Sequence, residues 1–205
     1  MFYEPKNGHG LRHDPLNAMV VPRPIGWIST ISISGIPNLA PYSFFNAVAY
    51  EPPQVMFAST GSHRNGRLKD AVLDAQTTGE FVVNIATKKL SAKMNATAVP
   101  APPDIDEFQY AGLTKAPSLI VKCPRVAESP LQLECRYLYS QNILSKSEDK
   151  PNVVVFGEVV GIHIDDEVIV DGIIDVLKVN PVGRLGYLDF VEVNNKFSME
   201  RPQWP

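Results

Sequence analysis

Three short stretches of the chain combine hydroxyl, aromatic and basic side chains. They are RPIGWIST at 23–30, NLAPYSFFN at 38–46 and STGSHR at 59–64. Lys69 follows the third stretch, at the start of a predicted helix. Hydroxyl groups, a cation and a helix N-terminus are the groups that bind phosphate in proteins. These residue types therefore predict a site for an anionic ligand, and a nucleotide is one candidate.

A flavin mononucleotide would use this mixture. Its phosphate needs cations, which the bases around the predicted helix can supply: Arg64, Arg67 and Lys69. Its ring needs an apolar or aromatic wall with backbone groups at the edge, which residues 43–46 and the pair at 29–30 can supply. Each residue taken alone also has a structural interpretation, as a core aromatic, a strand end or a solvated charge. Only the combination favours a ligand site.

Composition limits the class of protein. The 205 residues carry a formal net charge of −3, with 44% hydrophobic and 20% charged residues. A general nucleic-acid binder needs a basic surface, so we expect no nucleic-acid partner. The N-terminal segment lacks the apolar region of a signal peptide, and no apolar run approaches the roughly 20 residues of a membrane span. We therefore expect a cytoplasmic protein without a membrane partner, in which Cys123 and Cys135 stay reduced.

Several common catalytic motifs are absent from the sequence. The only Gly-x-Gly, at 8–10, has no strand before it, and neither a phosphate loop nor a Gly-x-Ser-x-Gly elbow occurs. The four histidines are scattered, without zinc-site spacing. The acidic cluster at 165–175 lacks the rhythm of a calcium loop and is better explained as a solvated face. No metal site is expected, and a cofactor would carry the chemistry of an enzyme of this kind.

Strands dominate the predicted secondary structure. Runs rich in β-branched and aromatic residues predict strands at 25–33, 55–59, 81–86, 131–139 and 153–164. Gly157 and Gly161 predict bulges in the last of these. Apolar spacing predicts a helix at 68–77, ended by Gly79, and a second at 88–98. We expect a surface excursion at 99–108 and a helix or turn at 165–176. Without regular β-α-β alternation, this order favours a closed antiparallel barrel.

Most of the chain resembles a known family. The motifs RPIGWIST, NLAPYSFFNAVAYEPPQVMFAS, KDAVLDAQTTGEFVVNIA, AGLT, LECR, GEVVGIHID and RLGY are similar, in the same order, to those of the flavin-reductase-like family, which includes flavoredoxins. The resemblance runs from about residue 21 to 187. It implies a mainly β fold, an FMN-binding split barrel of the six-stranded antiparallel Greek-key type. We expect one domain over 1–205, with a core at about 21–190 and an extension at each end.

The resemblance also implies a set of site residues. Ser29 and Thr30 would line the flavin, and the ring and ribityl chain would contact Ser43, Phe44, Phe45 and Asn46. The phosphate would be held by Ser59, Arg64 and Lys69. The chain departs from the family pattern at Ala71, where threonine is common, and at Tyr187, where glycine is common. The tail beyond 194 is unmatched and is a candidate cover for a neighbouring subunit.

The implied function is that of an FMN-dependent oxidoreductase acting as a homodimer, with the flavin at the subunit interface. NADH or NADPH would donate a hydride, and the acceptor would be a small molecule or a redox partner protein. No acid–base residue is assigned, and His63 is more simply a phosphate contact or an exposed side chain. Two alternatives stay open: a flavoredoxin-type electron carrier, and a flavin-binding or sensor protein without enzymatic activity. The sequence does not decide between NADH and NADPH, or whether FMN is retained or exchanged.

Overall fold

The fold is built on one large antiparallel sheet. The computed structural model describes residues 1–63, 66–147 and 150–204. The strand order in the sheet is β3-β2-β6-β9-β10-β5-β4. The strands are β2 (Gly26–Ile31), β3 (Pro37–Tyr42), β4 (Phe45–Tyr50), β5 (Pro53–Thr60), β6 (Glu80–Ile85), β9 (Leu131–Ile143) and β10 (Asn152–Ile164). The mainly β, split-barrel prediction is confirmed, although this sheet has seven strands and not six.

The barrel is split between β3 and β4. These strands form the two edges of the sheet, yet they follow each other in the chain and are linked only by Ser43 and Phe44. The sequence prediction placed no strand at either position. The link between the edge strands therefore lies at the open seam of the barrel.

Both predicted bulges lie in the longest strand pair. The register of β10 against β9 shifts between Phe156 and Gly157 and again between Val159 and Gly161. A Cβ on Gly157 would lie 2.4 Å from Cζ of the buried Phe81 ring. Glycine at this position lets the barrel wall approach the ring that fills its interior.

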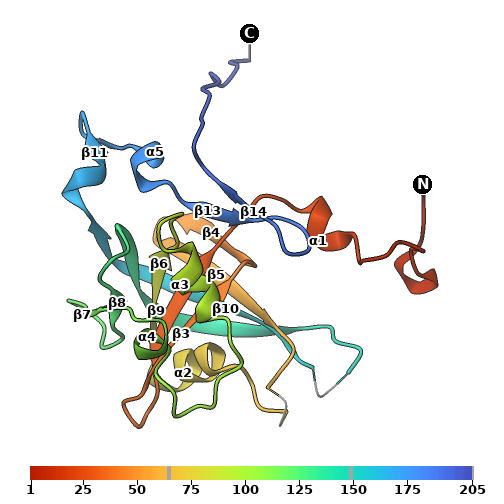
Figure 1. Cartoon of the computed structure of the whole chain (residues 1–205), viewed down its shortest axis with the longest axis horizontal. Coiled ribbons are helices and arrows are strands. Elements are labelled where there is room, and N and C mark those ends of the chain that lie inside the picture. Colours follow the sequence, from red (N-terminus) through yellow and green to blue (C-terminus); the bar gives the residue numbers. More distant parts are fainter. Residues whose placement is uncertain (64–65, 148–149, 205) are drawn as a thin grey trace.

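Helix α2 (Asp70–Thr78) lies at one end of the barrel (Figure 1). Ala71, Val72 and Ala75 are buried on its inner face, as their spacing predicts. Gly79 ends the helix in the left-handed conformation, with φ of 78°. The interior packed against α2 includes Phe57 and Phe81, whose rings meet edge to face with centroids 5.3 Å apart.

A second core lies outside the barrel wall, under α3 (Ser91–Ala96) and α4 (Glu107–Tyr110). Trp27 and Phe108 are fully buried there. The Trp27 indole Nε1 donates to Thr97 Oγ1 at 2.9 Å, which fixes the chain just after α3. The segment 99–108 was expected on the surface, and residues 99–106 are exposed or half-buried as predicted. Only its end, Glu107 and Phe108, is buried, because α4 packs against β3.

The remaining elements are short. A three-stranded sheet joins β1 (Arg23–Pro24), β13 (Val182–Arg184) and β14 (Phe190–Glu192). Residues 165–176, predicted as a helix or turn, begin with a 3-10 helix and continue as the hairpin of β11 (Ile169–Val170) and β12 (Ile173–Ile174), which was not predicted. The others are η1 (Pro5–Asn7), α1 (Leu16–Met19), β7 (Lys115–Ala116), β8 (Arg125–Val126), η2 (Asp166–Val168) and α5 (Val176–Val179).

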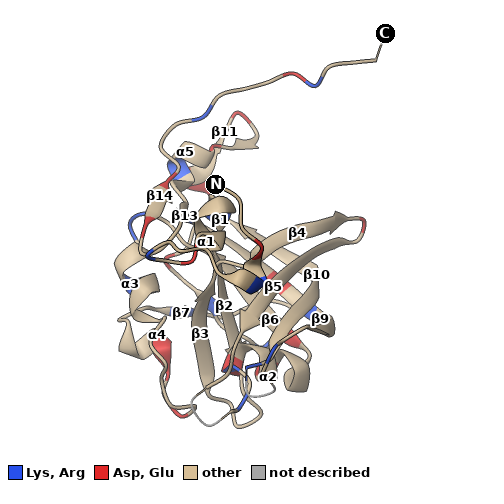
Figure 2. Ribbon diagram, turned by 90° about the vertical axis from the view of Figure 1, so that its right-hand side faces the viewer, with Lys and Arg blue, Asp and Glu red and all other residues tan. Residues whose placement is uncertain are grey.

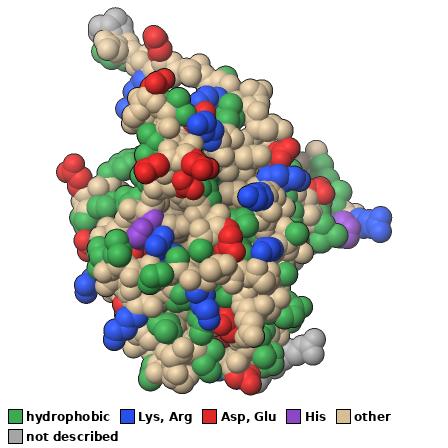
Figure 3. All heavy atoms as spheres, turned by 60° about the vertical axis from the view of Figure 1, so that its left-hand side comes forward, with side chains coloured by type: hydrophobic (Ala, Val, Ile, Leu, Met, Phe, Trp, Pro, Cys, Tyr) green, Lys and Arg blue, Asp and Glu red, His purple; other side chains and the backbone are tan. Residues whose placement is uncertain are grey.

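Both termini extend from the end of the barrel that lies away from α2 (Figures 1 and 2). On the face drawn in Figure 3, basic and acidic side chains are interspersed with hydrophobic ones. Cys123 and Cys135 are both buried and unpaired. No helix in the described residues is long and apolar enough to span a bilayer.

Candidate functional site

A cavity of about 580 Å³ opens at the seam of the barrel. Its walls come from the β3–β4 link, the end of β5, the start of α2, the chain after α3, and the β1–β13–β14 sheet. Its apolar lining includes Ile25, Ala40, Pro41, Phe44, Ala58, Met94, Val99 and Pro100. This volume and mixed lining are those of a small-molecule site.

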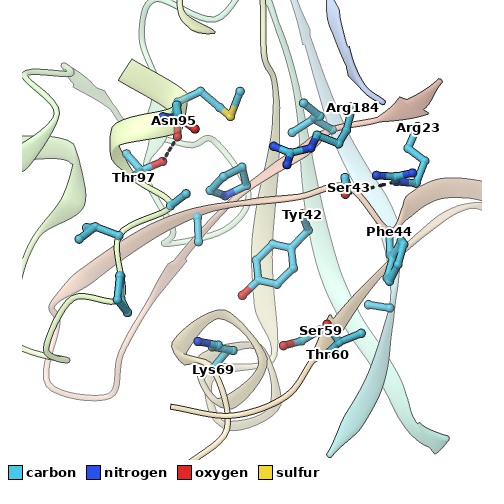
Figure 4. Close-up of a pocket in the computed structure, with 18 of the residues that line it drawn as sticks. Arg23, Tyr42, Ser43, Phe44, Ser59, Thr60, Lys69, Asn95, Thr97 and Arg184 are labelled. Atoms are coloured by element: carbon cyan, nitrogen blue, oxygen red, sulfur yellow. Dashed lines mark hydrogen bonds between the residues drawn. The ribbon is translucent and has the colours of Figure 1, made fainter. Parts of the chain in front are cut away.

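One end of the cavity carries a cation and hydroxyl groups. Lys69 lies there immediately before α2, opposite Ser59 and Thr60 at the end of β5 (Figure 4). The Tyr42 hydroxyl points toward this end. Desolvation of the Tyr42 phenol, and then the nearby Asp70 charge, raise its pKa well above the usual value. Tyr42 is therefore a neutral hydrogen-bonding group at physiological pH.

Asp70 is the first residue of α2 and already has partners. Arg67 Nη2 donates to its Oδ1 at 2.5 Å, and His63 Nε2 lies 3.0 Å from its Oδ2. These partners offset the carboxylate charge next to Lys69. His63 therefore lies at the cavity, where it contacts a carboxylate.

The other end of the cavity carries two arginines, Arg23 and Arg184 (Figure 4). Arg23 Nε points to Ser43 Oγ at 3.4 Å, and its Cζ lies 5.8 Å from the centroid of the Phe44 ring. Arg184 Cζ lies 4.4 Å from the centroid of Phe190. The cavity thus has a cationic group at each end and aromatic side chains near the second.

Two buried carboxyl groups line this cavity or the one next to it. Glu107 lines it and also lines an adjoining cavity of about 520 Å³. Burial raises the pKa of Glu107 to about 7. The hydrogen bond that its Oε2 accepts from Leu39 N at 3.1 Å acts in the opposite direction and lowers the pKa. Burial likewise raises the pKa of Asp74 to about 6, although Thr30 Oγ1 donates to its Oδ2 at 2.8 Å. Near neutral pH, Glu107 is therefore half protonated.

The structure brings four of the predicted site residues to the cavity: Ser43, Phe44, Ser59 and Lys69. Four others lie away from the cavity: Phe45, Asn46, Ser29 and Thr30. Phe45 packs on the barrel core, and Asn46 is exposed, with its Oδ1 accepting from Ala47 N. Arg64 lies outside the described residues.

Ser29 and Thr30, predicted to line the flavin, do not line the cavity. Both are fully buried. Ser29 Oγ donates to Pro124 O at 2.6 Å, and Thr30 Oγ1 is bonded to Asp74. Successive side chains on β2 point to opposite faces of the sheet, and both faces are covered at this point. A single sequence does not reveal that both hydroxyls have partners inside the protein.

Several residues that line the cavity were not predicted from the sequence. They are Arg23, Tyr42, Thr60, Asn95, Thr97, Glu107 and Arg184. Arg23, Tyr42 and Thr60 belong to the three polar stretches, so their residue types already pointed to a ligand site. Arg184 reaches the cavity only because β13 pairs with β1, about 160 residues away in the sequence.

A family model described as the flavin reductase like domain matches residues 18–173. The chain belongs to the flavin reductase-like family. An uncharacterized protein of Aquifex aeolicus is 41% identical over 169 residues, covering 82% of this chain and 83% of that protein.

Solved structures agree with membership of the flavin reductase-like family. Nitrilotriacetate monooxygenase component B from Bacillus cereus superposes with a TM-score of 0.89 at 26% identity, covering 97% of this chain and 98% of that one. Flavoredoxin of Desulfovibrio vulgaris superposes with a TM-score of 0.76 at 18% identity, covering 94% and 96% of the two chains. The first is similar to this chain in sequence and fold, and the second supports the fold alone.

Proposed function

We propose that this protein is an NADH- or NADPH-dependent FMN oxidoreductase whose flavin binds in the seam cavity. The main support is a group of hydrogen-bond donors for a phosphate at one end of that cavity. Lys69 supplies a cation beside the first turn of α2, and Ser59 and Thr60 supply hydroxyls across from it. Membership of the flavin reductase-like family supports the flavin as the nucleotide.

The residues present fit FMN. Lys69, Ser59 and Thr60 would hold the phosphate, and Ser43 and Phe44 at the seam would contact the ring. The cavity volume of about 580 Å³ is in the range of small-molecule sites. Bound FMN would supply the redox chemistry, namely hydride uptake from the nicotinamide and electron delivery to an acceptor.

The chain itself contributes binding, orientation and exclusion of water. The Trp27–Thr97 hydrogen bond holds the apolar wall at 97–101 against the cavity. The pairing of Asp70 with Arg67 and His63 keeps its carboxylate from opposing a phosphate at Lys69. No described group is required as a general acid or base for hydride transfer, which depends on close and correctly oriented reactants.

We further propose a homodimer with the flavin at the subunit interface. Support comes from edge strand β4, where Tyr50 is 92% exposed and Val48 is 46% exposed. Light scattering after size-exclusion chromatography tests this, with a mass near twice 22.6 kDa expected. A mass of one chain in the presence of FMN would contradict it.

The experiment that tests the activity is an anaerobic absorption titration of FMN-loaded protein with NADH, then NADPH. Bleaching of the bound-flavin bands by either nucleotide is expected. Stable bands that dithionite bleaches but neither nucleotide does would favour the electron carrier or sensor. Absence of bound-flavin bands at saturating FMN would contradict the flavin site itself.

A further inference from the structure

Two arginines face each other at the cavity end that lies away from Lys69. Arg23 on β1 is the direct cross-strand partner of Arg184 on β13. Both line the same cavity. Like charges placed opposite each other on antiparallel strands are destabilising. This cost is one that a bound anion would remove.

The Arg23 charge is buried without being neutralised. Its residue is only 7% exposed. Nη1 donates to Asn17 O at 2.5 Å and Val20 O at 2.7 Å, and Nη2 donates to Leu185 O at 3.0 Å. These carbonyls satisfy N–H groups but carry no net charge. Burial, and then the Arg184 charge, lower the pKa of Arg23, but a guanidinium stays protonated in proteins.

Arg184 retains donors that can reach a ligand. Its Nη2 donates to Tyr187 O, while Nε and Nη1 donate no hydrogen bond in the described part of the chain. Across residues 1–63, 66–147 and 150–204, neither arginine forms an ion pair with a carboxylate. Asp14, which lines the same cavity, accepts instead from Leu16 N at 2.9 Å. The pair is a concentrated positive charge inside a cavity, beside the Phe44 and Phe190 rings but without a carboxylate partner in the described part of the chain.

We propose that Arg23 and Arg184 form an anion subsite for the redox substrate that exchanges electrons with the flavin. Arg184 contacts a phosphate or carboxylate directly, and the more deeply buried Arg23, its cross-strand partner, adds a second positive charge. This inference rests on the proposed function, since it assigns the opposite cationic end, at Lys69, to the FMN phosphate. Guanidinium groups bind both oxyanions in the same planar, two-point geometry. The subsite therefore selects anionic substrates over neutral ones.

Calorimetric titration of FMN-saturated protein with two redox-inert probes tests the subsite. ADP-ribose carries the pyrophosphate of a nicotinamide dinucleotide, and citrate represents a small polycarboxylate acceptor. The variants are Arg184→Gln, the conservative Arg184→Lys, and Arg136→Gln as a control that removes an exposed arginine outside the cavity. FMN affinity is measured separately on each variant. Arg23 is left intact because it also clamps the chain around α1.

In Arg184→Gln the dissociation constant of at least one probe should rise roughly ten- to hundredfold, the loss of a charge-assisted contact. Arg184→Lys should recover part of the affinity, and Arg136→Gln should match the wild type. The affected probe identifies the anion as dinucleotide or polycarboxylate. Unchanged binding in Arg184→Gln, no binding of either probe to the wild type, or an equal loss of FMN affinity would overturn the subsite. If the protein does not bind FMN, the proposed function fails, and the same titrations without FMN still test the pair.

Discussion

Lys69 and Arg184 lie at opposite ends of one cavity, with the Tyr42 ring between them (Figure 4). The two positive charges come from unrelated elements, since Lys69 precedes α2 and Arg184 ends β13. Such a cavity suits a ligand set with anionic groups at both ends and an uncharged middle. A phosphate-bearing flavin together with an anionic redox substrate meets that description.

Glu107 makes stability depend on pH near neutrality. Its pKa is about 7 in the folded protein, against an ordinary value of 4.5, so the folded state binds more protons than the unfolded state between these values. Stability from this group is therefore fully present below pH 4.5 and is lost as pH rises toward 7. Glu107→Gln should remove that decline and raise the free energy of unfolding at pH 8 by on the order of 1–3 kcal/mol.

Urea unfolding of wild type and Glu107→Gln between pH 4.5 and 8 checks this, with Glu200→Gln in the exposed tail as the control. The two curves should meet at the acid end. A wild-type decline that persists unchanged in Glu107→Gln would contradict the assignment.

Glu134 has the opposite pH dependence. Burial alone would raise its pKa, but backbone N–H donors from 119–121 and the His163 ring lower it to about 2. His163 Nε2 lies 2.5 Å from Oε1. The stability from Glu134 is present above pH 4.5 and is lost as pH falls through that value toward 2.

Glu134→Gln should lower the free energy of unfolding at pH 7 by on the order of 2–4 kcal/mol, because it leaves buried donors poorly paired. The difference from wild type should narrow between pH 5 and 3 in chemical unfolding. A constant difference across that range would mean that the Glu134 charge is not what stabilises the 119–121 segment.

Gly157 and Phe81 are predicted to be coupled. A Cβ at 157 would lie 2.4 Å from Phe81 Cζ, and Phe81 is fully buried. Gly157→Ala should therefore destabilise the protein by about 1–3 kcal/mol through overpacking. Phe81→Leu should also destabilise it, but the double variant should lose less than the sum of the two. Additive losses in a double-mutant cycle from urea unfolding would show that the ring is not the obstacle.

The sequence predicted the parts of the fold that follow from local pattern. The i, i+3, i+4 spacing of Ala71, Val72 and Ala75 and the glycine at 79 define α2 to within two residues at its start. The glycines at 157 and 161 mark real bulges. By contrast, β3 contains Pro37 and Pro41, which disfavour a strand prediction, and both β3 and β4 are defined as strands by their pairing with β2 and β5.

The same limit applies to the candidate site. Ser43, Phe44 and Ser59 were accessible from residue type because they lie in the polar stretches at 38–46 and 59–64, and Lys69 follows the second of these at the start of a predicted helix. Arg184 was not, because its place depends on a pairing between distant segments. Ser29 and Thr30 have the residue types of a ligand site, but burial gives both hydroxyls internal partners.

The Lys69 end of the cavity is the proposed binding site of the FMN phosphate. The most direct measurement is an FMN titration, followed by quenching of flavin fluorescence, of wild type, Lys69→Ala and the control Lys89→Ala. Lys89 is exposed and does not line the cavity. Loss of a charge-assisted contact of about 1.5–3 kcal/mol should raise the dissociation constant of Lys69→Ala roughly ten- to hundredfold, with Lys89→Ala unchanged. Equal affinity in all three proteins, or no FMN binding by the wild type, would contradict the account.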